Sequence, residues 1–252
     1  MKRAQDLAKK PGPAREMLTF YSVLLAVQKD LYEYLRRLEG WLPSGFLEQD
    51  LAVLMPSLPG LLKAVETAGP TTLAEEAARL SHLSDSEMRG YLLEYWKEPS
   101  DLQFFAKVFL QPYGNWMIET GARPLDRCLE AAENRCPHCA GKPQLSYLLT
   151  HESEGSARYL LCSNCLSSWN FRRLVCANCG EEEPEKLGYF RAPELDYVRV
   201  DTCDGCKHYI KSIDLARLGL AVPLVDEVAA AALDLWARKE GFTKIELNVV
   251  GL

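Results

Sequence analysis

The sequence predicts an α+β protein, in which an all-helical N-terminal domain over residues 1–133 is followed by two small cysteine modules and a C-terminal helix. Two observations lead to this prediction. Apolar residues at helical spacing fill the first half, and eight of the nine cysteines form four Cys-x-x-Cys pairs in the second half. The tandem modules are expected at 134–174 and at 175–252, the second including the C-terminal helix.

The helical half begins with a long amphipathic stripe that Gly40 is expected to stop. Its apolar residues recur at three- and four-residue steps: Met17, Phe20, Tyr21, Leu24, Val27, Leu31, Leu35 and Leu38. Three capping-box patterns follow, namely Thr72 with Glu75, Ser84 with Glu87, and Ser100 with Gln103. Pro112 is expected to end the last helix. Five or six helices are therefore expected between residues 14 and 112.

Beyond Asn134 the pattern changes to short β-favouring runs that glycine, proline and acidic turns separate. The expected strands are Leu145–Leu149, Ala157–Leu161, Ser168–Phe171, Gly188–Phe190, Tyr197–Val200 and Tyr209–Ile213. A helical pattern returns after Pro223 and ends at Gly241, and Lys244–Val250 has the pattern of a final strand.

An internal repeat orders the cysteine pairs. Cys139 and Cys162 enclose 22 residues, and Cys179 and Cys203 enclose 23. The gap between the two units, from Cys165 to Cys176, is only 10 residues. Near-equal inserts indicate duplication of one module and favour a sequential grouping of the pairs. The two expected quartets are Cys136, Cys139, Cys162 and Cys165, and Cys176, Cys179, Cys203 and Cys206.

Each quartet has the pattern of a metal site. Two thiolates three positions apart hold one ion from a tight turn, and two such turns complete a tetrahedron of sulfurs at ~2.3 Å. Gly141 and Gly180 suit such turns because glycine tolerates positive φ. Redox pairs of the thioredoxin type are the alternative, but they stand alone in a βαβ context that is missing here. The spacing is typical of zinc ribbons and of rubredoxin-like single-iron sites, and it does not separate the two metals.

The remaining candidate functional residues have weaker sequence signals than the cysteine pairs. Cys128 is interpreted as a small residue of the helical core, with a reactive thiol as the alternative. His138 and His208 lie in or beside the metal turns, where four cysteines already fill the coordination sphere. Five aromatic residues are either a shell around the sulfurs or ordinary core: Tyr147, Trp169, Phe171, Tyr189 and Tyr197. Closed four-cysteine sites leave no position for a substrate, so we expect no enzyme.

Charge and hydropathy argue against nucleic-acid binding and against a membrane-spanning helix. The net charge is -6, and residues 136–210 carry 8 basic against 10 acidic residues. Such a field repels phosphate, which argues against a nucleic-acid-binding zinc ribbon. The longest apolar run, Leu51 to Leu62, contains Pro56 and Pro59 and is too short for a membrane span. Clustered cysteines and a basic N-terminus without an apolar signal core favour the cytoplasm.

The order of these motifs resembles the formate dehydrogenase accessory protein family, FdhE. The resemblance rests on four segments: Cys136-Pro-His-Cys139-Ala-Gly-Lys-Pro, Arg158-Tyr-Leu-Leu-Cys162-Ser-Asn-Cys165, Arg173-Leu-Val-Cys176-Ala-Asn-Cys179-Gly and Asp201-Thr-Cys203-Asp-Gly-Cys206. It extends more loosely to Gln28 and to Phe109–Tyr113. Val225-Asp226-Glu227 departs from the two aspartates that the family pattern leads us to expect.

The resemblance implies a helical domain followed by two rubredoxin-like metal modules. It also implies a cytoplasmic maturation factor that binds the molybdenum-containing catalytic subunit of formate dehydrogenase, a precursor with a twin-arginine signal, before or around its export. Association of the family with iron favours iron in the eight-cysteine sites, with zinc as the alternative. The competing reading is a rubredoxin-like electron carrier, since one iron in four thiolates shuttles one electron.

Overall fold

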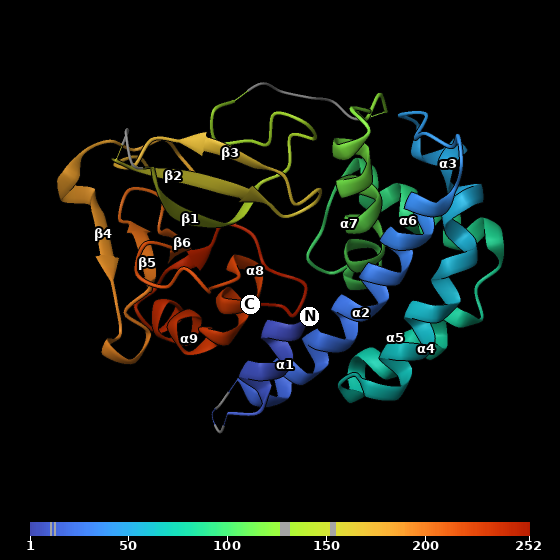
Figure 1. The fold of residues 1–252 in the computed structure, drawn as a ribbon, viewed down its shortest axis with the longest axis horizontal. Helices are drawn as coiled ribbons and strands as arrows, with labels where there is room; N and C mark the ends of the chain where they lie inside the picture. Colours follow the sequence, from blue (N-terminus) through green and yellow to red (C-terminus); the bar gives the residue numbers. More distant parts are fainter. Residues whose placement is uncertain (11, 13, 127–131, 152–154) are drawn as a thin grey trace. The chain divides into compact units, whose positions relative to one another are not determined.

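The computed structural model describes residues 1–10, 12, 14–126, 132–151 and 155–252 (Figure 1). The chain divides into two compact units. Unit 1 comprises Met1, Phe20–Glu130 and Asn164–Leu166, and unit 2 comprises Lys2–Thr19, Ala131–Ser163 and Ser167–Leu252. Cys128 lies outside the described residues, so the interpretation made of it has no structural counterpart.

Unit 1 is helical, as predicted. Its elements are α2 (Arg15–Arg37, which begins in unit 2), α3 (Leu47–Leu54), the 3-10 turn η1 (Met55–Ser57), α4 (Leu58–Ala68), α5 (Thr71–Ser81), α6 (Asp85–Lys97) and α7 (Phe104–Glu119). The apolar stripe of α2 faces the core, because Leu24, Leu31 and Leu35 are buried. Gly40, at φ 71°, follows the helix as its stop signal predicts.

One of the three predicted capping boxes is present. Ser84 accepts a hydrogen bond from the Glu87 backbone N–H while the Glu87 carboxylate accepts from the Ser84 backbone. The box at Thr72 is wrong, because α5 begins one residue earlier with Pro70 as its N-cap. The box at Ser100 is also wrong: its hydroxyl accepts from the Leu102 N–H at 3.2 Å, and α7 starts only at Phe104.

The prediction that Pro112 ends the last helix is wrong, because α7 continues through it to Glu119. Proline removes the hydrogen bond to the carbonyl four residues earlier, which here belongs to Val108. Gln28 of α2 donates its side-chain amide to that oxygen at 2.9 Å and to Gln111 Oε1 at 2.9 Å. A long-range partner therefore satisfies the carbonyl that the proline leaves open.

One run among the described residues passes a length and composition test for a membrane-crossing helix. It is Leu47–Ala68, with a mean hydropathy of 1.2 and 33% of its window buried. Pro56 and Pro59 do not interrupt it, because each lies in the first turn of the helix it starts, where proline is tolerated. A single such run is weak evidence for a span, since a core helix of a globular domain passes the same test.

Unit 2 is built on a seven-stranded mixed sheet with the order β3-β2-β1-β6-β5-β4, and β7 pairs with β6. The strands are β1 (Pro143–His151), β2 (Gly155–Cys162), β3 (Ser168–Phe171), β4 (Leu187–Phe190), β5 (Val198–Cys203), β6 (His208–Asp214) and β7 (Thr243–Lys244). Each cysteine module contributes a three-stranded antiparallel meander, as the internal repeat suggests. Parallel pairing of β1 with β6 joins the two meanders into one sheet.

The two faces of this sheet carry different cores. Val198, Val200, Tyr209 and Ile213 pack with residues of α9 on one face. Leu160, Phe171 and Ile210 pack with Val175, Ala177 and Ile245 in a second cluster. The predicted C-terminal helix is present as two short helices, α8 (Pro223–Ala229) and α9 (Ala231–Lys239), with a break at Ala230. The final strand predicted over Lys244–Val250 is wrong, because β7 covers only Thr243–Lys244 and residues 245–250 form bends, turns and irregular chain.

A short N-terminal helix that the sequence pattern did not indicate, α1 (Lys2–Ala8), belongs to unit 2. Arg3 makes a two-pronged contact with the buried carboxylate of Asp226 on α8, at 3.1 Å and 2.6 Å. Tyr197 also donates to this carboxylate, at 3.0 Å. The segment where the sequence departs from the family pattern is therefore a structural anchor.

Glu227, the next residue on α8, lies in a fully buried charge cluster. Its carboxylate contacts Lys211 at 3.0 Å, Lys244, and the Asn248 amide at 2.6 Å. Burial opposes ionisation, but Lys211 and Lys244 hold the pKa of Glu227 at about 2. Asp234 of α9 completes the cluster through Lys211.

Candidate metal centres

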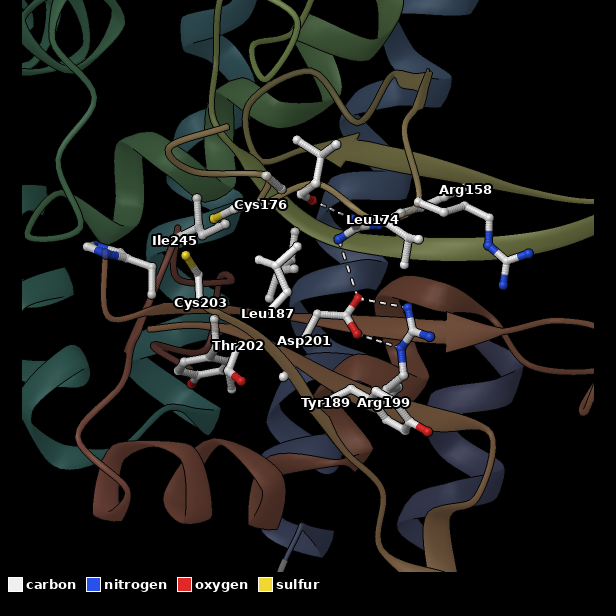
Figure 2. A pocket seen from close by; sticks show the side chains of 17 residues that line it. Arg158, Leu174, Cys176, Leu187, Tyr189, Arg199, Asp201, Thr202, Cys203 and Ile245 are labelled. Carbon is white, nitrogen blue, oxygen red and sulfur yellow. Dashed lines mark hydrogen bonds and ion pairs between the residues drawn. The ribbon is translucent and has the colours of Figure 1, made fainter. Parts of the chain in front are cut away.

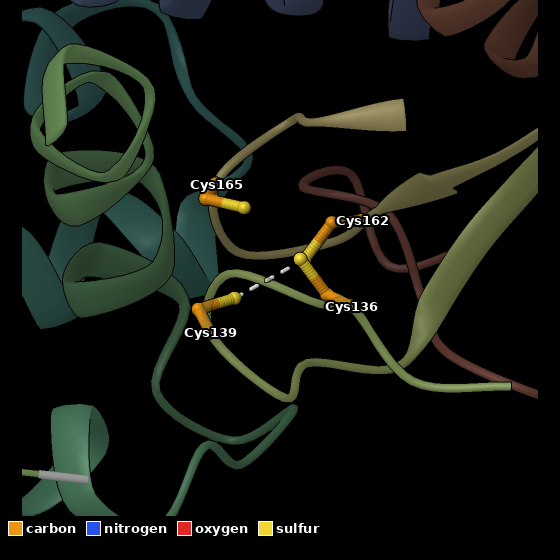
Figure 3. Close-up of side chains that lie close together, drawn as sticks. All are labelled: Cys136, Cys139, Cys162 and Cys165. Carbon is orange, nitrogen blue, oxygen red and sulfur yellow. Dashed lines mark hydrogen bonds between the residues drawn. The ribbon is translucent and has the colours of Figure 1, made fainter. Parts of the chain in front are cut away.

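The first quartet brings together two turns of the first module. Cys136 and Cys139 lie in the turn before β1, and Cys162 and Cys165 lie at the end of β2 and in the turn toward β3. All four Sγ atoms lie within 4.8 Å of one another, and those of Cys139 and Cys162 are 3.4 Å apart (Figure 3). Each of these cysteines is at most 3% exposed.

The second quartet repeats this arrangement. Cys176 and Cys179 form a turn before β4, while Cys203 ends β5 and Cys206 lies in the turn to β6. The Sγ atoms of Cys176 and Cys206 are 3.7 Å apart, and those of Cys179 and Cys203 are 3.8 Å apart. Of the three possible combinations of pairs, the structure has the sequential one that the insert lengths favour.

The four cysteine turns share one backbone conformation. The residue directly after each second cysteine has positive φ: Ala140 at 54°, Leu166 at 58°, Gly180 at 78° and Lys207 at 57°. In three of them, at Cys136, Cys176 and Cys203, that residue donates its N–H to the carbonyl of the first cysteine, at 2.8 to 3.0 Å. Gly180 was correctly singled out for this role, whereas Ala140 takes the place expected of Gly141. A non-glycine residue at positive φ gives no strong sequence signal, so three of the four positions were missed.

Backbone and side-chain groups are directed at the sulfurs. The N–H of His138 lies 3.4 Å from Cys136 Sγ, and the N–H of Asn178 lies 3.4 Å from Cys176 Sγ. The Ser167 hydroxyl is 3.1 Å from Cys136 Sγ. At Cys176 the Asn178 N–H opposes the rise in pKa that burial causes, because hydrogen bonds to the charged form lower its free energy.

Both quartets have the dimensions of a tetrahedral metal site. Four sulfurs at ~2.3 Å from an ion are about 3.8 Å apart, whereas a disulfide would bring two of them to about 2.05 Å. The separations of 3.4 to 3.8 Å fit the first arrangement. A set of four thiolates suits zinc or a single iron, and this geometry is common to both.

The two quartets differ in their surroundings. Cys179 is exposed and Cys206 is half-buried, whereas the first quartet is buried throughout. Burial raises the pKa of Cys176 and of Cys203 above the ordinary thiol value. Burial acts in the same direction on Cys206, but hydrogen bonds from the Asn178 side chain and the His208 backbone lower its pKa to about 7. The second quartet therefore combines an exposed cysteine residue, Cys179, with one whose pKa is lowered, Cys206.

The other sequence candidates lie outside the sulfur clusters. His208 Nδ1 is 2.7 Å from the Cys206 carbonyl oxygen, and no histidine joins the two metal-binding groups of the described residues. Most of the aromatic candidates belong to the cores of the sheet: Tyr147 and Tyr197 pack on the helix-covered face, and Phe171 and Trp169 in the second cluster. Tyr189 is 71% exposed.

Comparisons with known proteins show which family models and relatives the chain matches. Residues 135–173 match the family model of the FdhE central domain, and residues 162–250 match that of the FdhE C-terminal domain. A curated FdhE homolog of Aquifex aeolicus is 36% identical over 207 residues, which cover 81% of this chain and 72% of that protein. An FdhE homolog of Haemophilus influenzae is 30% identical over 188 residues, 74% of this chain and 61% of that protein.

A solved structure extends the comparison to the whole chain. The crystal structure of the FdhE protein from Pseudomonas aeruginosa matches with a TM-score of 0.72 at 20% identity, covering 99% of this chain and 93% of that chain. At this identity the match shows a shared fold. Together with the family models and the identity to the Aquifex aeolicus protein, it leads to one conclusion: the chain belongs to the FdhE family.

Proposed function

We propose that this protein is a cytoplasmic accessory factor that binds the catalytic subunit of formate dehydrogenase during its assembly, before the subunit is exported. Membership of the FdhE family supports an accessory role in formate dehydrogenase production. The observation that carries the proposal is the pair of preformed quartets, each with four sulfurs converging from two turns. Sites closed by four protein ligands stabilise a fold and leave no position for a substrate.

In this proposal each quartet holds one metal ion. Cys136, Cys139, Cys162 and Cys165 hold the first ion, and Cys176, Cys179, Cys203 and Cys206 hold the second. Iron is favoured by the family resemblance, and zinc is the alternative. The ion would cross-link the two turns of each module, whose turns and strands, about 40 residues without the C-terminal helix, are too few to be stable on their core alone. The domain division proposed from the sequence, 1–133, 134–174 and 175–252, assigns one ion to each module.

Co-purification tests the binding step. A tagged copy of the protein is expressed with the precursor of a formate dehydrogenase catalytic subunit, and the complex is recovered from the cytoplasmic fraction. We expect recovery with the intact chain and a loss of recovery when Cys176 and Cys179 are both replaced by serine. Failure of the intact chain to retain the precursor would overturn the proposal, and normal retention by the variant would show that the second module is not needed.

An electron carrier is the second candidate, and the exposure of Cys179 favours it, because an accessible sulfur offers a route for electron transfer at the second site. An absorption spectrum tests this second candidate, because it distinguishes iron from zinc in the two quartets. A red-brown protein whose colour is bleached reversibly by a reductant has a redox-active iron, whereas a colourless zinc protein cannot carry electrons.

A further inference from the structure

A pocket of about 90 Å³ lies in unit 2 beside the second quartet. Its lining includes Arg158 of β2, Arg199 and Asp201 of β5, Tyr189 of β4 and the sulfur ligands Cys176 and Cys203 (Figure 2). Tyr189 stands opposite Asp201 in the strand register, so both side chains lie on the same face of the sheet. The pocket therefore opens beside β4, the strand at the edge of the sheet.

Apart from the sulfur ligands Cys176 and Cys203, the pocket lining carries more positive than negative charge. Three guanidinium groups line the pocket, those of Arg158, Arg173 and Arg199, and two of them, Arg158 and Arg199, contact its one carboxylate, Asp201. Arg199 contacts this carboxylate through two nitrogen atoms, at 2.5 Å and 3.1 Å, and Arg158 Nη2 lies 3.4 Å from it. The Ser212 hydroxyl donates to the same group at 2.6 Å. The Asp201 carboxylate is thus occupied by groups of the sheet.

Arg173 is exposed and donates to the Ser156 carbonyl oxygen at 3.4 Å, near the upper limit for a hydrogen bond. The pKa of Arg158 lies below its ordinary value, first because burial disfavours the charged form and further because Arg199 and Arg173 repel it. Asp201 and Cys176 act in the opposite direction and favour the charged form of Arg158. A second carboxylate near Arg173 would relieve the crowding of positive charge, because charge-assisted contacts of guanidinium with carboxylate are strong and can be bidentate.

The rim of the pocket suits a peptide better than a free ion. Leu174 is 78% exposed and Tyr189 is 71% exposed, and both line the pocket. In the described sheet β4 pairs with β5 on one side only, so its outer backbone groups are open to an added strand. A strand laid along β4 would alternate its side chains between the two faces, one of them the face of the pocket.

The geometry points to a recognition pocket for an acidic side chain of an extended peptide, which pairs along β4 and places its carboxylate beside Arg173 and Arg199. This inference rests on the proposed function, because the peptide would be a segment of the polypeptide that the protein helps to mature. Leu174 and Tyr189 would contact the neighbouring apolar side chains of that segment.

Fluorescence anisotropy with a defined probe tests this pocket on the full-length, metal-loaded protein. The probe is a labelled peptide of alternating valine and glutamate, and its counterpart replaces glutamate with glutamine. We expect the acidic peptide to bind about 10-fold more tightly than the glutamine peptide, as for a hydrogen bond to a charged group. Arg173→Gln should weaken binding of the acidic peptide by about 10-fold. Arg172→Gln is the matched control, because Arg172 carries the same charge one position away and pairs with Glu182 and Glu133.

Three results would overturn the inference. If free acetate displaces the probe as well as the acidic peptide itself does, the pocket binds small anions and not a peptide. If Arg173→Gln releases the second metal ion but leaves peptide binding unchanged, the guanidinium is only a counter-charge to the thiolates. If the intact protein does not distinguish the two peptides, the pocket is not an acidic-residue site. The co-purification experiment decides the proposed function separately, since it does not depend on this pocket.

Discussion

The two cysteine modules have the same local design but different surroundings. Both present two Cys-x-x-Cys turns with positive φ after the second cysteine, and both bring four sulfurs together. The first quartet is buried throughout, whereas the second exposes Cys179 and half-exposes Cys206. The difference shows that the turn sequence determines whether sulfurs converge, while the packing around the turns determines how accessible they are. Four expected effects, from the largest to the smallest, test how the turn sequence and the surrounding packing contribute.

The largest effect is expected from removing a metal-binding turn. Replacing Cys136 and Cys139 with serine should lower the metal content by one ion per chain and destabilise the sheet, because β1 pairs with both β2 and β6. Binding at a four-thiolate site contributes on the order of 10 kcal/mol. Elemental analysis and thermal unfolding measure both consequences.

The matched variant replaces Cys176 and Cys179, which precede the edge strand β4. It should also lose one ion, but with a smaller fall in the unfolding temperature, because β4 has one neighbouring strand. Equal destabilisation by the two variants would show that burial and sheet position do not distinguish the modules.

The second effect concerns the buried charges within the second module. The pKa of Glu227 falls from an ordinary 4.5 to about 2 in the folded protein. Its ion pairs therefore stabilise the fold fully above pH 4.5, and this stabilisation is lost as the pH falls toward about 2. The loss should amount to about 3 kcal/mol, as measured by urea unfolding across this range.

Glu227→Gln is the control for this pH dependence. It should lower the free energy of unfolding at neutral pH by about 3–5 kcal/mol, because Lys211 and Lys244 lose their shared partner. It should also flatten the acid dependence. If the free energy of unfolding of this variant depends on acid pH as in the intact protein, other carboxylates cause that dependence.

The third effect is kinetic. Because Cys179 is exposed, the second ion should pass to an external chelator at least about 10-fold faster than the first, as expected for an accessible thiolate. Mass spectrometry after brief alkylation should find Cys179 modified before any cysteine of the first quartet. Release of both ions at one rate would mean that unfolding of unit 2 as a whole controls the exchange.

The smallest effect tests the turns themselves. Ala140 and Gly180 occupy equivalent positions in the two modules, at φ 54° and 78°. Ala140→Gly should stabilise the first module and Gly180→Ala should destabilise the second, each by about 1 kcal/mol, because a side chain disfavours this conformation. Chemical unfolding of the metal-loaded protein measures both. Opposite signs would show that the turns are under no strain at these positions.

The sequence by itself determined the local features of this protein. The six strands of the two modules lie where β-favouring runs occur, and the sulfur quartets group as the insert lengths predict. Ser84 caps α6 as its pattern indicates. These features depend on residues close together in the chain, so composition and spacing contain the information.

Only the tertiary structure decided the features that depend on distant partners. Pro112 stays inside α7 because Gln28, 84 positions earlier, donates to the carbonyl that the proline leaves open. Asp226 anchors α1 because the Arg3 side chain contacts its carboxylate. The two modules form one sheet because β1 pairs with β6. Exposure of Cys179 and the grouping of Arg158, Arg173 and Arg199 around one pocket arise in the same way. Hydrogen bonds, ion pairs and burial act through space, so residue spacing along the chain does not reveal them.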